Sequence, residues 1–595
     1  MKKIFPCFGK DLEMIGHEPM HKVYHSGFEF VALDAAAAGV CQKAAMPYIL
    51  VDDWMGEQAF CQAWQAADEW ETQWYLPEKT AFTWDGICWP AYDKEGMHHF
   101  WREITLLHYL VTAFKRRGGR EMLFFRKQHP RPALYYYPSD IHGEYLRHTL
   151  GARARTLSVP AAVRYAPPIS PGIDFFSSDS NAERARSVAD KIVMALNPLE
   201  LHRFAPVIQA LQATYPDQVV FASISPEQNA PPKPAHCDAI RGVIPGRADN
   251  YRPEAGRAFM QGYGRLMQNS SACPWYPVLG ALKSHFEFHL GRRWPVLAGN
   301  LDAWMNLWRR HRPRAVIVSN LADPESQLPA AAADRLRIPT LSIPHGQVGR
   351  PVNVEAGHVL YGSCLLKQAY RFAGVPEHRL YPSRALVNPE EYPTRDVRTE
   401  PDRSRLNLLA VTIPVGYPET AYFITSPSSQ VRALGILDRI PEDLKNRIAL
   451  TIKPHPAMPD MEMIRSIGMD LARKTCDPDL SLDQLVARAD LVIAVNCAGS
   501  AVMNILRMGK PLFYLWTDPL LKTQIGRKAI DRKLGPAGLE YSSETEFWNG
   551  VRRYMGDTDF AGKLEARSQS FYRAHINDLR YPAIDEVVAN CLAAG

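Results

Sequence analysis

Short apolar runs alternate along this chain with longer segments in which apolar positions recur every three to four residues. This alternation is typical of parallel strands covered by amphipathic helices, so the pattern predicts an α/β protein. The N-terminus carries no signal-peptide pattern and is interpreted as a first strand. The other elements expected in the first third are strands over 28–33, 48–51, 122–125 and 133–137, and helices over 56–71 and 98–116.

The middle of the chain, from about 165 to 300, is rich in proline, serine and asparagine. Helical patterns at 182–195 and 200–213 and a strand pattern at 219–224 interrupt it, and we interpret the region as loops and helices inserted in a first domain. A strand over 315–320, a helix over 325–336 and a strand over 340–343 then predict a βαβ unit. No repeat of 20 to 50 residues is evident, so a solenoid or propeller is not indicated.

A hydrophilic stretch over 388–405 is predicted to separate two domains. Beyond it the apolar runs are continuous enough for buried parallel strands, and amphipathic segments lie between them. The expected strands are 406–413, 448–452, 491–495 and 511–514, and the expected helices include 430–439, 482–488 and 501–508. This order predicts a doubly wound sheet, whose ligands bind outside the carboxyl ends of its strands.

Composition narrows the class of protein. The chain has 595 residues, 46% of them hydrophobic and 22% charged, and no apolar run approaches the ~18 residues that cross a bilayer. Ten cysteines are scattered without a CxxC pair, so we expect neither disulfides nor a zinc site, and a cytoplasmic location fits best. The mild net charge of +6 comes with no nucleic-acid module, which makes nucleic acid an unexpected partner.

The strongest candidate motif is Thr451-Ile452-Lys453-Pro454-His455-Pro456, at the carboxyl end of an expected strand. Prolines restrict the backbone of this turn and would present Lys453 and His455 at the sheet edge. Lysine offers a positive charge, and histidine offers a donor that can protonate a departing phosphate. The alternative is a proline-rich turn with solvated polar side chains.

A second candidate motif follows the expected strand 491–495. There the run from Asn496 to Ala501 turns into a helix, with Gly499 and Ser500 at its start. Glycine lets the backbone approach a ligand closely, and the first N–H groups of a helix bind phosphate oxygens. Ser500 can equally be an N-cap, and both roles can coexist.

The order Lys-x-His-Pro, then AD-L-V-I-x-x-N-x-x-G-S-x-x-x-N-I-L-x-x-G-K-P, resembles the donor domain of GT-B glycosyltransferases that use cytidine-nucleotide sugars. That group includes bacterial sialyltransferases, Kdo transferases and capsule enzymes. The resemblance is good over residues 405–520, moderate over 314–350 and slight before 300. It implies two Rossmann-like domains facing across a cleft, the GT-B architecture.

By this resemblance the donor phosphate is held by His455, Pro456, Gly499 and Ser500. The neighbouring residues Lys453 and Ala501 are further candidates for the same phosphate site. Asn496 and Asn504 are the candidates for contacts with the nucleotide. Related families often have adjacent serines or threonines at the second motif and a glutamate a few residues later. Here Asn504 stands in the place of that glutamate, which argues against a UDP donor, although an amide can also bind a hydroxyl.

Glycosyl transfer also needs a base or a nucleophile and a group that stabilises the departing phosphate. The candidates for stabilising the departing phosphate are His455, Lys453 and Ser500. The candidates for the base lie at expected strand ends: Asp140, Asp323, Glu325, His345 and Glu419. Each of these can instead be a cap or a solvated loop residue. No DxD motif stands at a strand end, so a metal-independent reaction without a further cofactor is expected.

The seven tryptophans between residues 54 and 101 suggest either sugar stacking or core packing, and core packing explains most tryptophans. We expect an acceptor-side domain over 1–388, a donor domain over 389–565 and, over 566–595, a helix that crosses back to the first domain. Basic clusters leave peripheral contact with the inner membrane open.

The expected partners are a nucleotide sugar and a glycan or glycolipid acceptor, and the favoured donor is a CMP-linked 2-keto-3-deoxy acid such as Kdo or a nonulosonic acid. A UDP-sugar transferase, a CDP-glycerol-type phosphotransferase and a UDP-sugar 2-epimerase remain alternatives among enzymes. A non-catalytic carbohydrate-binding scaffold remains the alternative from another class of protein.

Overall fold

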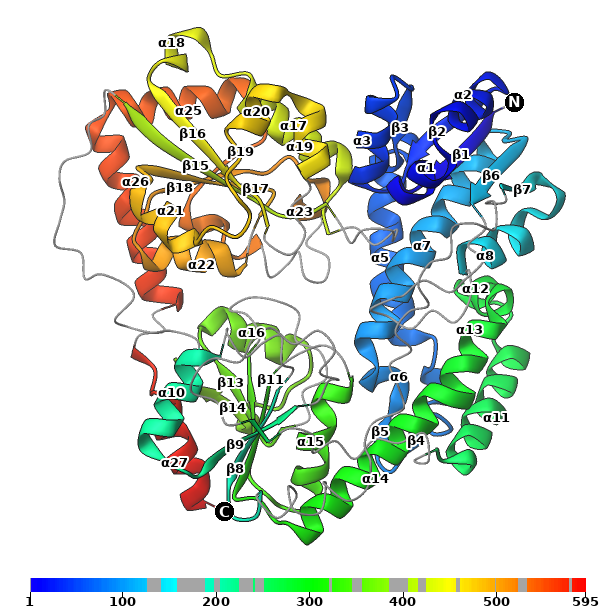
Figure 1. Ribbon diagram of the computed structural model, residues 1–595, viewed down its shortest axis with the longest axis vertical. Helices are drawn as coiled ribbons and strands as arrows, with labels where there is room; N and C mark the ends of the chain where they lie inside the picture. Colours follow the sequence, from blue (N-terminus) through cyan, green and yellow to red (C-terminus); the bar gives the residue numbers. More distant parts are fainter. Residues whose placement is uncertain are drawn as a thin grey trace.

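The computed structural model of the protein describes residues 2–125, 141–157, 188–196, 204–223, 239–240, 251–319, 324–344, 356–384, 405–415, 424–455, 461–497, 499–522, 532–576 and 580–594. Within these stretches the chain forms three parallel sheets and one antiparallel hairpin, β4 (Thr83–Trp84) with β5 (Ile87–Cys88) (Figure 1). The α/β class and the Rossmann-like domains predicted from the sequence are confirmed. The described residues hold three such sheets, however, where two were expected.

The first sheet has the strand order β3-β2-β1-β6-β7, with parallel pairing throughout. Its strands are β1 (Lys3–Cys7), β2 (Phe28–Ala32), β3 (Tyr48–Leu50), β6 (Glu121–Phe125) and β7 (Ala154–Leu157). Successive residues of β1 and β2 are buried on both faces, which is typical of a parallel strand covered by helices. The helices of this unit are α1 (Gly9–Ile15), α2 (His17–His25), α3 (Ala35–Lys43), α4 (Val51–Met55), α5 (Glu57–Gln73), α6 (Trp89–Tyr92), α7 (Lys94–Arg116) and α8 (Ile141–Leu150).

The second sheet has the order β10-β9-β8-β11-β12-β13-β14. Its strands are β8 (Ile192–Leu196), β9 (Val219–Ser223), β10 (Ala239–Ile240), β11 (Ala315–Ser319), β12 (Thr340–Ile343), β13 (His358–Tyr361) and β14 (Leu380–Pro382). The prediction of a helix over 182–195 is wrong for its last residues. From Ile192 onward the chain forms β8, a fully buried strand paired with β9 and β11. Its five apolar residues match a buried strand as well as a helix, and periodicity alone does not separate the two.

Residues 1–388 therefore contain two sheets, where the sequence analysis expected one domain with insertions. A helical layer lies between these sheets in the chain, where inserted loops and helices were expected, although these four helices were not located from the sequence. Its helices are α11 (Pro253–Asn269), α12 (Tyr276–Ala281), α13 (Lys283–Phe288) and α14 (Trp294–Arg310), and those on the second sheet are α10 (Ala205–Thr214), α15 (Pro324–Arg335) and α16 (Cys364–Phe372).

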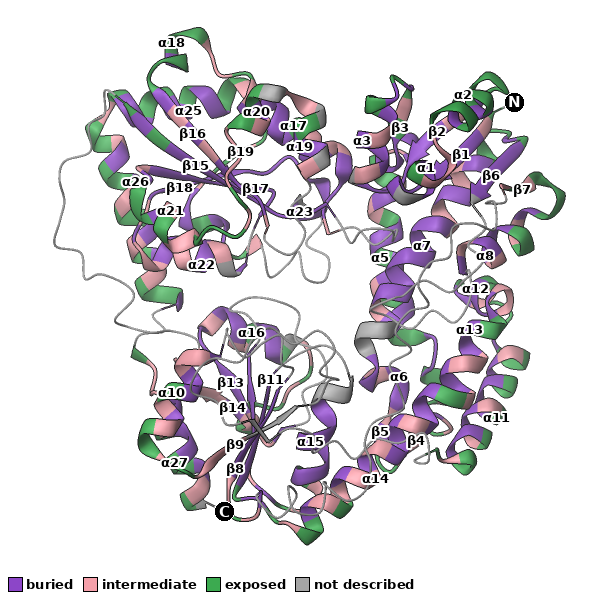
Figure 2. Cartoon of the chain, in the orientation of Figure 1, coloured by how far each residue is buried: buried purple, intermediate pink, exposed green. Residues whose placement is uncertain are grey.

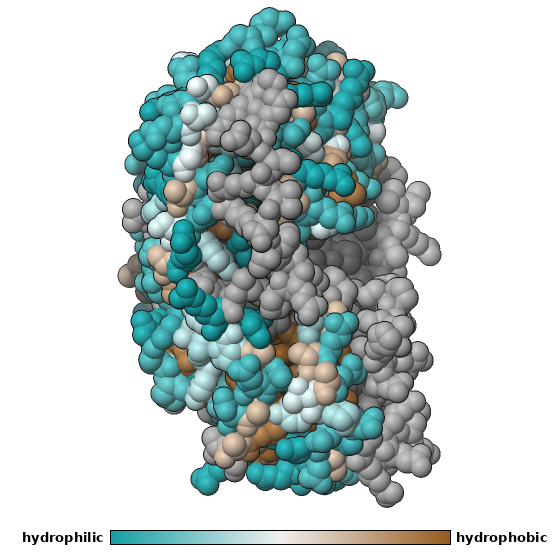
Figure 3. Space-filling view, turned by 90° about the vertical axis from the view of Figure 1, so that its left-hand side faces the viewer, coloured by the Kyte–Doolittle hydropathy of each residue, from teal (hydrophilic) through white to brown (hydrophobic). Residues whose placement is uncertain are grey.

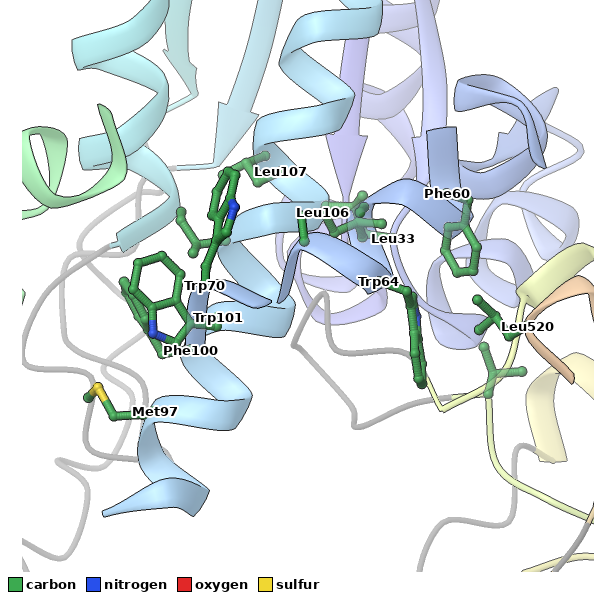
Figure 4. Packing of buried hydrophobic residues seen from close by; sticks show 14 of the residues in the cluster. Leu33, Phe60, Trp64, Trp70, Met97, Phe100, Trp101, Leu106, Leu107 and Leu520 are labelled. Atoms are coloured by element: carbon green, nitrogen blue, oxygen red, sulfur yellow. The ribbon is translucent and has the colours of Figure 1, made fainter. Parts of the chain in front are cut away.

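Tryptophans fill the core between this layer and helices α5 and α7. Six of the seven tryptophans between residues 54 and 101 are buried, and Trp84 is half-buried. Trp70 and Trp101 meet edge to face with ring centroids 6.0 Å apart, and Phe100 packs beside Trp101 (Figure 4). This burial confirms the core-packing interpretation of these residues. Large aromatic rings suit such a core because they bury the most apolar surface per residue.

The third sheet has the order β16-β15-β17-β18-β19, again parallel. Its strands are β15 (Leu406–Thr412), β16 (Ile448–Lys453), β17 (Leu491–Val495), β18 (Leu512–Leu515) and β19 (Leu539–Tyr541). Its helices are α17 (Pro427–Asp438), α18 (Glu442–Lys445), α19 (Met461–Ile467), α20 (Met469–Arg473), α21 (Leu482–Arg488), α22 (Ser500–Arg507), α23 (Pro519–Lys522), α25 (Glu544–Gly556) and α26 (Thr558–Phe571).

The three sheets are linked in a ring (Figure 1). Helices α3 and α4 of the first unit pack against α19 and α17 of the third. The C-terminal helix α27 (Ile584–Ala594) packs on α10 and shares a core with β8 and β11 of the second sheet. Helix α14 packs on α15 and so joins the helical layer to the second sheet.

Burial follows this arrangement. The central strands of the three sheets are buried, whereas edge strands such as β7 and β19 are partly exposed, and the inner faces of α5 and α7 are buried as well (Figure 2). On the face shown in Figure 3 the described residues are mainly hydrophilic. Among the helices of the described stretches, none combines the length and the apolar character needed to cross a bilayer.

Candidate functional site

The carboxyl edge of the third sheet is the place where its topology favours a ligand. In chain order the strands are arranged 2-1-3-4-5, so the direction of winding reverses between β15 and β17. Loops on the two sides of such a switch point diverge and leave a crevice outside the strand ends. The loops after β15 and β17 therefore border the expected ligand position.

The two sequence motifs meet at this edge. Lys453 at the end of β16 and Ala494 near the end of β17 are both paired with Val411 of β15, so they lie at the same level of the sheet. His455 and Asn496 each follow two residues later. Only β15 stands between β16 and β17, which corresponds to roughly 10 Å between the strands. A phosphate group at the edge is therefore within reach of both loops.

Gly499 gives the second loop its shape. It is buried and serves as the N-cap residue of α22, with φ +105° and ψ −148°. Residues with a Cβ atom are strongly disfavoured in this backbone region, so glycine is needed at position 499 for the chain to enter the helix. Ser500 is the first residue of α22, and its side chain lies outside the described ones. The N–H groups at this helix start carry the positive end of the helix dipole.

The ammonium group of Lys453 is hydrogen-bonded to backbone carbonyl groups of the protein. Its side chain is buried, with 4% of the residue exposed, and Nζ donates to the carbonyl oxygens of Pro478 and Pro454. Burial lowers the pKa of this ammonium group. These bonds fasten the turn that carries His455 to the loop around Pro478, so Lys453 positions the turn.

Asn496 pins two loops together. It has a positive φ of 45°, and 1% of it is exposed. Its Oδ1 accepts from the backbone N–H groups of Thr517 (2.8 Å) and Asp518 (3.0 Å), and its Nδ2 donates to Gln430 Oε1 (3.1 Å). The amide thereby ties the loop after β17 to the loop after β18 and to α17, and fixes the approach to Gly499.

The other two residues of this motif face neighbours on the helices. Asn504 donates from Nδ2 to Asp483 Oδ1 of α21 (3.2 Å) and accepts from Arg507 (2.8 Å). Ala501 is half-buried against the apolar core beneath α22. Both residues help to fix α22 on its sheet.

The remaining candidate residues fall outside what the structure describes. Five of them are not described at all: Asp140, Asp323, His345, Glu419 and Pro456. Glu325 is in the first turn of α15, and its side chain is not among the described ones. The assignment of the base therefore stays a prediction.

A contact that the sequence did not indicate closes one side of this edge. Asp52 of α4 is 3% exposed and accepts from Ser428 Oγ (2.7 Å), Ser428 N (3.1 Å) and Ser426 Oγ at the start of α17. A carboxylate on a helix N-terminus is favoured by the helix dipole. Phe60 and Trp64 of α5 lie toward Leu520 of α23 beside this contact (Figure 4). The first unit thus docks on the third close to its carboxyl edge.

We expect acid to raise the stability of the folded protein through Asp52, because protonation removes a buried charge. Burial raises the pKa of the Asp52 carboxyl above its ordinary value of 3.8, although the serine hydrogen bonds oppose this shift. The contribution of Asp52 to stability is then fully present below pH 3.8 and is lost as the pH rises through the folded-state pKa. Urea unfolding at about pH 4 and pH 7 tests this: the wild type loses more stability over this interval than Asp52→Asn. Equal losses in the two proteins contradict it.

No protein-family model matches the chain, and no curated protein matches it. Among solved structures, S. aureus MnaA with UDP is similar over 64% of this chain and 91% of its own, with 11% identity and a TM-score of 0.34. A variant of the wall teichoic acid polymerase TagF covers 70% and 94% (10%, 0.37), and the Methanocaldococcus jannaschii UDP-GlcNAc 2-epimerase covers 68% and 100% (12%, 0.34). Similarity at this level assigns no activity to the chain.

Proposed function

We propose that the protein is a glycosyltransferase whose third sheet binds the phosphate of a nucleotide-activated sugar. The observation that carries this proposal is the position of two loops at one sheet edge: the His455 turn after β16 and the glycine-led start of α22 after β17. They border the switch point where doubly wound sheets bind their ligands. The motif resemblance over 405–520 supports the same residues.

In the proposed reaction the N–H groups at the start of α22 hold the donor phosphate. The bond between the anomeric carbon and the phosphate oxygen breaks, the acceptor oxygen bonds to that carbon, and the acceptor proton passes to a base. His455 stabilises the charge that develops on the departing phosphate, by a hydrogen bond or by a proton. Asp140, Asp323, Glu325, His345 and Glu419 remain the candidates for the base. The donor site is proposed to work without a metal.

The proposed donor is a CMP-linked 2-keto-3-deoxy acid, such as Kdo or a nonulosonic acid, and the acceptor is a bacterial surface glycan or glycolipid at the inner face of the membrane. The His-Pro and Gly-Ser motifs support this choice over a UDP sugar or CDP-glycerol. Asn504 does not contribute to this choice, because its amide is engaged with Asp483 and Arg507.

Thermal unfolding with CMP, CDP and UDP tests the donor. A ligand present at about 100 times its Kd stabilises the folded state by about 2.7 kcal/mol, which corresponds to a rise in Tm of about 2 to 5 °C. We expect CMP to produce this rise. If UDP raises the Tm and CMP does not, the CMP-donor assignment is wrong. If none of the three nucleotides raises the Tm, the proposal is contradicted.

The His455→Ala variant distinguishes a transferase from the alternative of a carbohydrate-binding scaffold. A scaffold binds glycan in the absence of nucleotide, and its function survives His455→Ala. A transferase loses turnover in the His455→Ala variant, and we expect a fall of about 10²- to 10³-fold, the size typical of losing one group that stabilises transition-state charge. Transfer of sugar from the CMP donor to glycan is the measurement.

A further inference from the structure

Two helices of the first unit bring together three side chains that metals bind. Asp68 and Glu71 are three residues apart on α5 and so share one face of that helix. His98 on α7 lies opposite, with Nδ1 2.6 Å from Glu71 Oε2. One ligand atom from each of the three residues lies within 4.8 Å of the other two. The group shares no residue with the proposed donor site.

The group lies between α5 and α7 and is partly exposed. The side chain of Glu71 is 2% exposed, whereas those of Asp68 and His98 are 16% and 17% exposed. An ion can therefore reach the group from the solvent, and Glu71 would hold it from the buried side. Carboxylates that are almost completely buried are rare unless they are paired or coordinate a metal.

The group carries two carboxylates, and one guanidinium lies beside them. Arg102 of α7 donates to Asp68 and to the carbonyl of Trp64, and its guanidinium stacks 3.8 Å from the Trp64 ring centroid. The Arg102 guanidinium thus faces a group that carries the two carboxylates of Asp68 and Glu71. A divalent cation would bring positive charge between these carboxylates.

We propose that Asp68, Glu71 and His98 bind a divalent first-row transition metal that ties α5 to α7. An imidazole nitrogen with two carboxylate oxygens suits Zn²⁺, Mn²⁺ or Fe²⁺ better than Mg²⁺ or Ca²⁺, which prefer oxygen ligands alone. Zn²⁺ ligands lie about 2.0 to 2.2 Å from the ion, so tetrahedral partners are roughly 3.4 Å apart. The present separations reach that spacing through side-chain shifts of about 1 Å, and water completes the shell.

Metal content tests this proposal in the full-length chain. The protein is stripped with a chelator, supplied with Zn²⁺, dialysed and analysed by elemental mass spectrometry. We expect the wild type to retain about one more Zn²⁺ per chain than His98→Asn, and Zn²⁺ to raise its Tm by a few degrees in a way that EDTA reverses. Exposed histidines at 17, 21 and 25 on α2 can retain additional Zn²⁺, so the difference between variants is the decisive quantity.

His142→Asn is the matched control. His142 pairs with the buried Glu103 of α7 in the same way, Nε2 to Oε1 at 2.5 Å, but it belongs to no such three-residue group among the described residues. We expect this variant to keep the metal. Equal zinc in the wild type and His98→Asn overturns the proposal, and so does equal loss in the two histidine variants. If His98→Asn does not fold, Glu71→Gln replaces it, and a wild type that retains no Zn²⁺, Mn²⁺ or Fe²⁺ also overturns the proposal.

Discussion

The Gly499→Ala variant is expected to lose nucleotide binding while the rest of the protein stays folded. Gly499 has φ +105° and ψ −148°, a region that is essentially reserved for glycine, and a Cβ there costs about 1 to 3 kcal/mol. The chain relieves this strain by moving the start of α22, which carries the N–H groups proposed to hold the phosphate. We expect the Kd for the stabilising nucleotide to rise at least about 10-fold, measured by calorimetry.

Gly374→Ala is the control for backbone strain alone. Gly374 also has a positive φ, of 86°, but it follows α16 on the second sheet, and a Cβ there meets no atom within 4 Å. We expect this variant to lose stability and to bind nucleotide with the wild-type Kd. An unchanged Kd in a folded Gly499→Ala protein would show that the start of α22 does not hold the phosphate.

The Asn496→Ala variant is expected to show the largest loss of stability at the edge of the third sheet. The substitution leaves the buried N–H groups of Thr517 and Asp518 without their acceptor, at about 1 to 3 kcal/mol each. Alanine also tolerates the positive φ of this position less well than asparagine, by about 1 kcal/mol. We expect the third unit to lose about 3 to 7 kcal/mol, seen as faster hydrogen exchange in β15 and β17.

Asn504→Ala is the control for removing an asparagine side chain that does not link the two loops. Asn504 is half-buried within α22 and bonds to the side chains of Asp483 and Arg507, which retain access to water. We expect a loss below about 1 kcal/mol. Similar losses in the two variants would show that the pinning of the loops by Asn496 is not what stabilises the edge.

The third sheet was the part of the fold that the sequence indicated most clearly. Its buried strands are continuous apolar runs flanked by amphipathic helices, and the observed strands β15 to β18 differ from the predicted ranges by one residue at most. The convergence of the His455 turn and the Gly499 loop followed from topology, because parallel strands end at a common edge. Glycine before a helix start was likewise a local signal for the unusual backbone at Gly499.

The rest depends on partners far apart in the chain. Lys453 and Asn496 were expected to face a ligand, but their polar atoms bind Pro478, Thr517 and Asp518 after the chain has returned to the same edge. The contact between Asp52 and Ser426 spans 374 residues, and no local pattern announces it. In the same way, apolar periodicity could not separate the strand β8 from a helix or divide residues 1–388 into two sheets.

A crystal structure of the protein with CMP tests the central claim most directly, because each of the three sheets has a switch point of its own. We expect the nucleotide phosphate on the N–H groups at the start of α22, within hydrogen-bond distance of His455. Nucleotide bound at the edge of the first or second sheet, or bound at the third sheet with its phosphate away from both loops, would contradict the account.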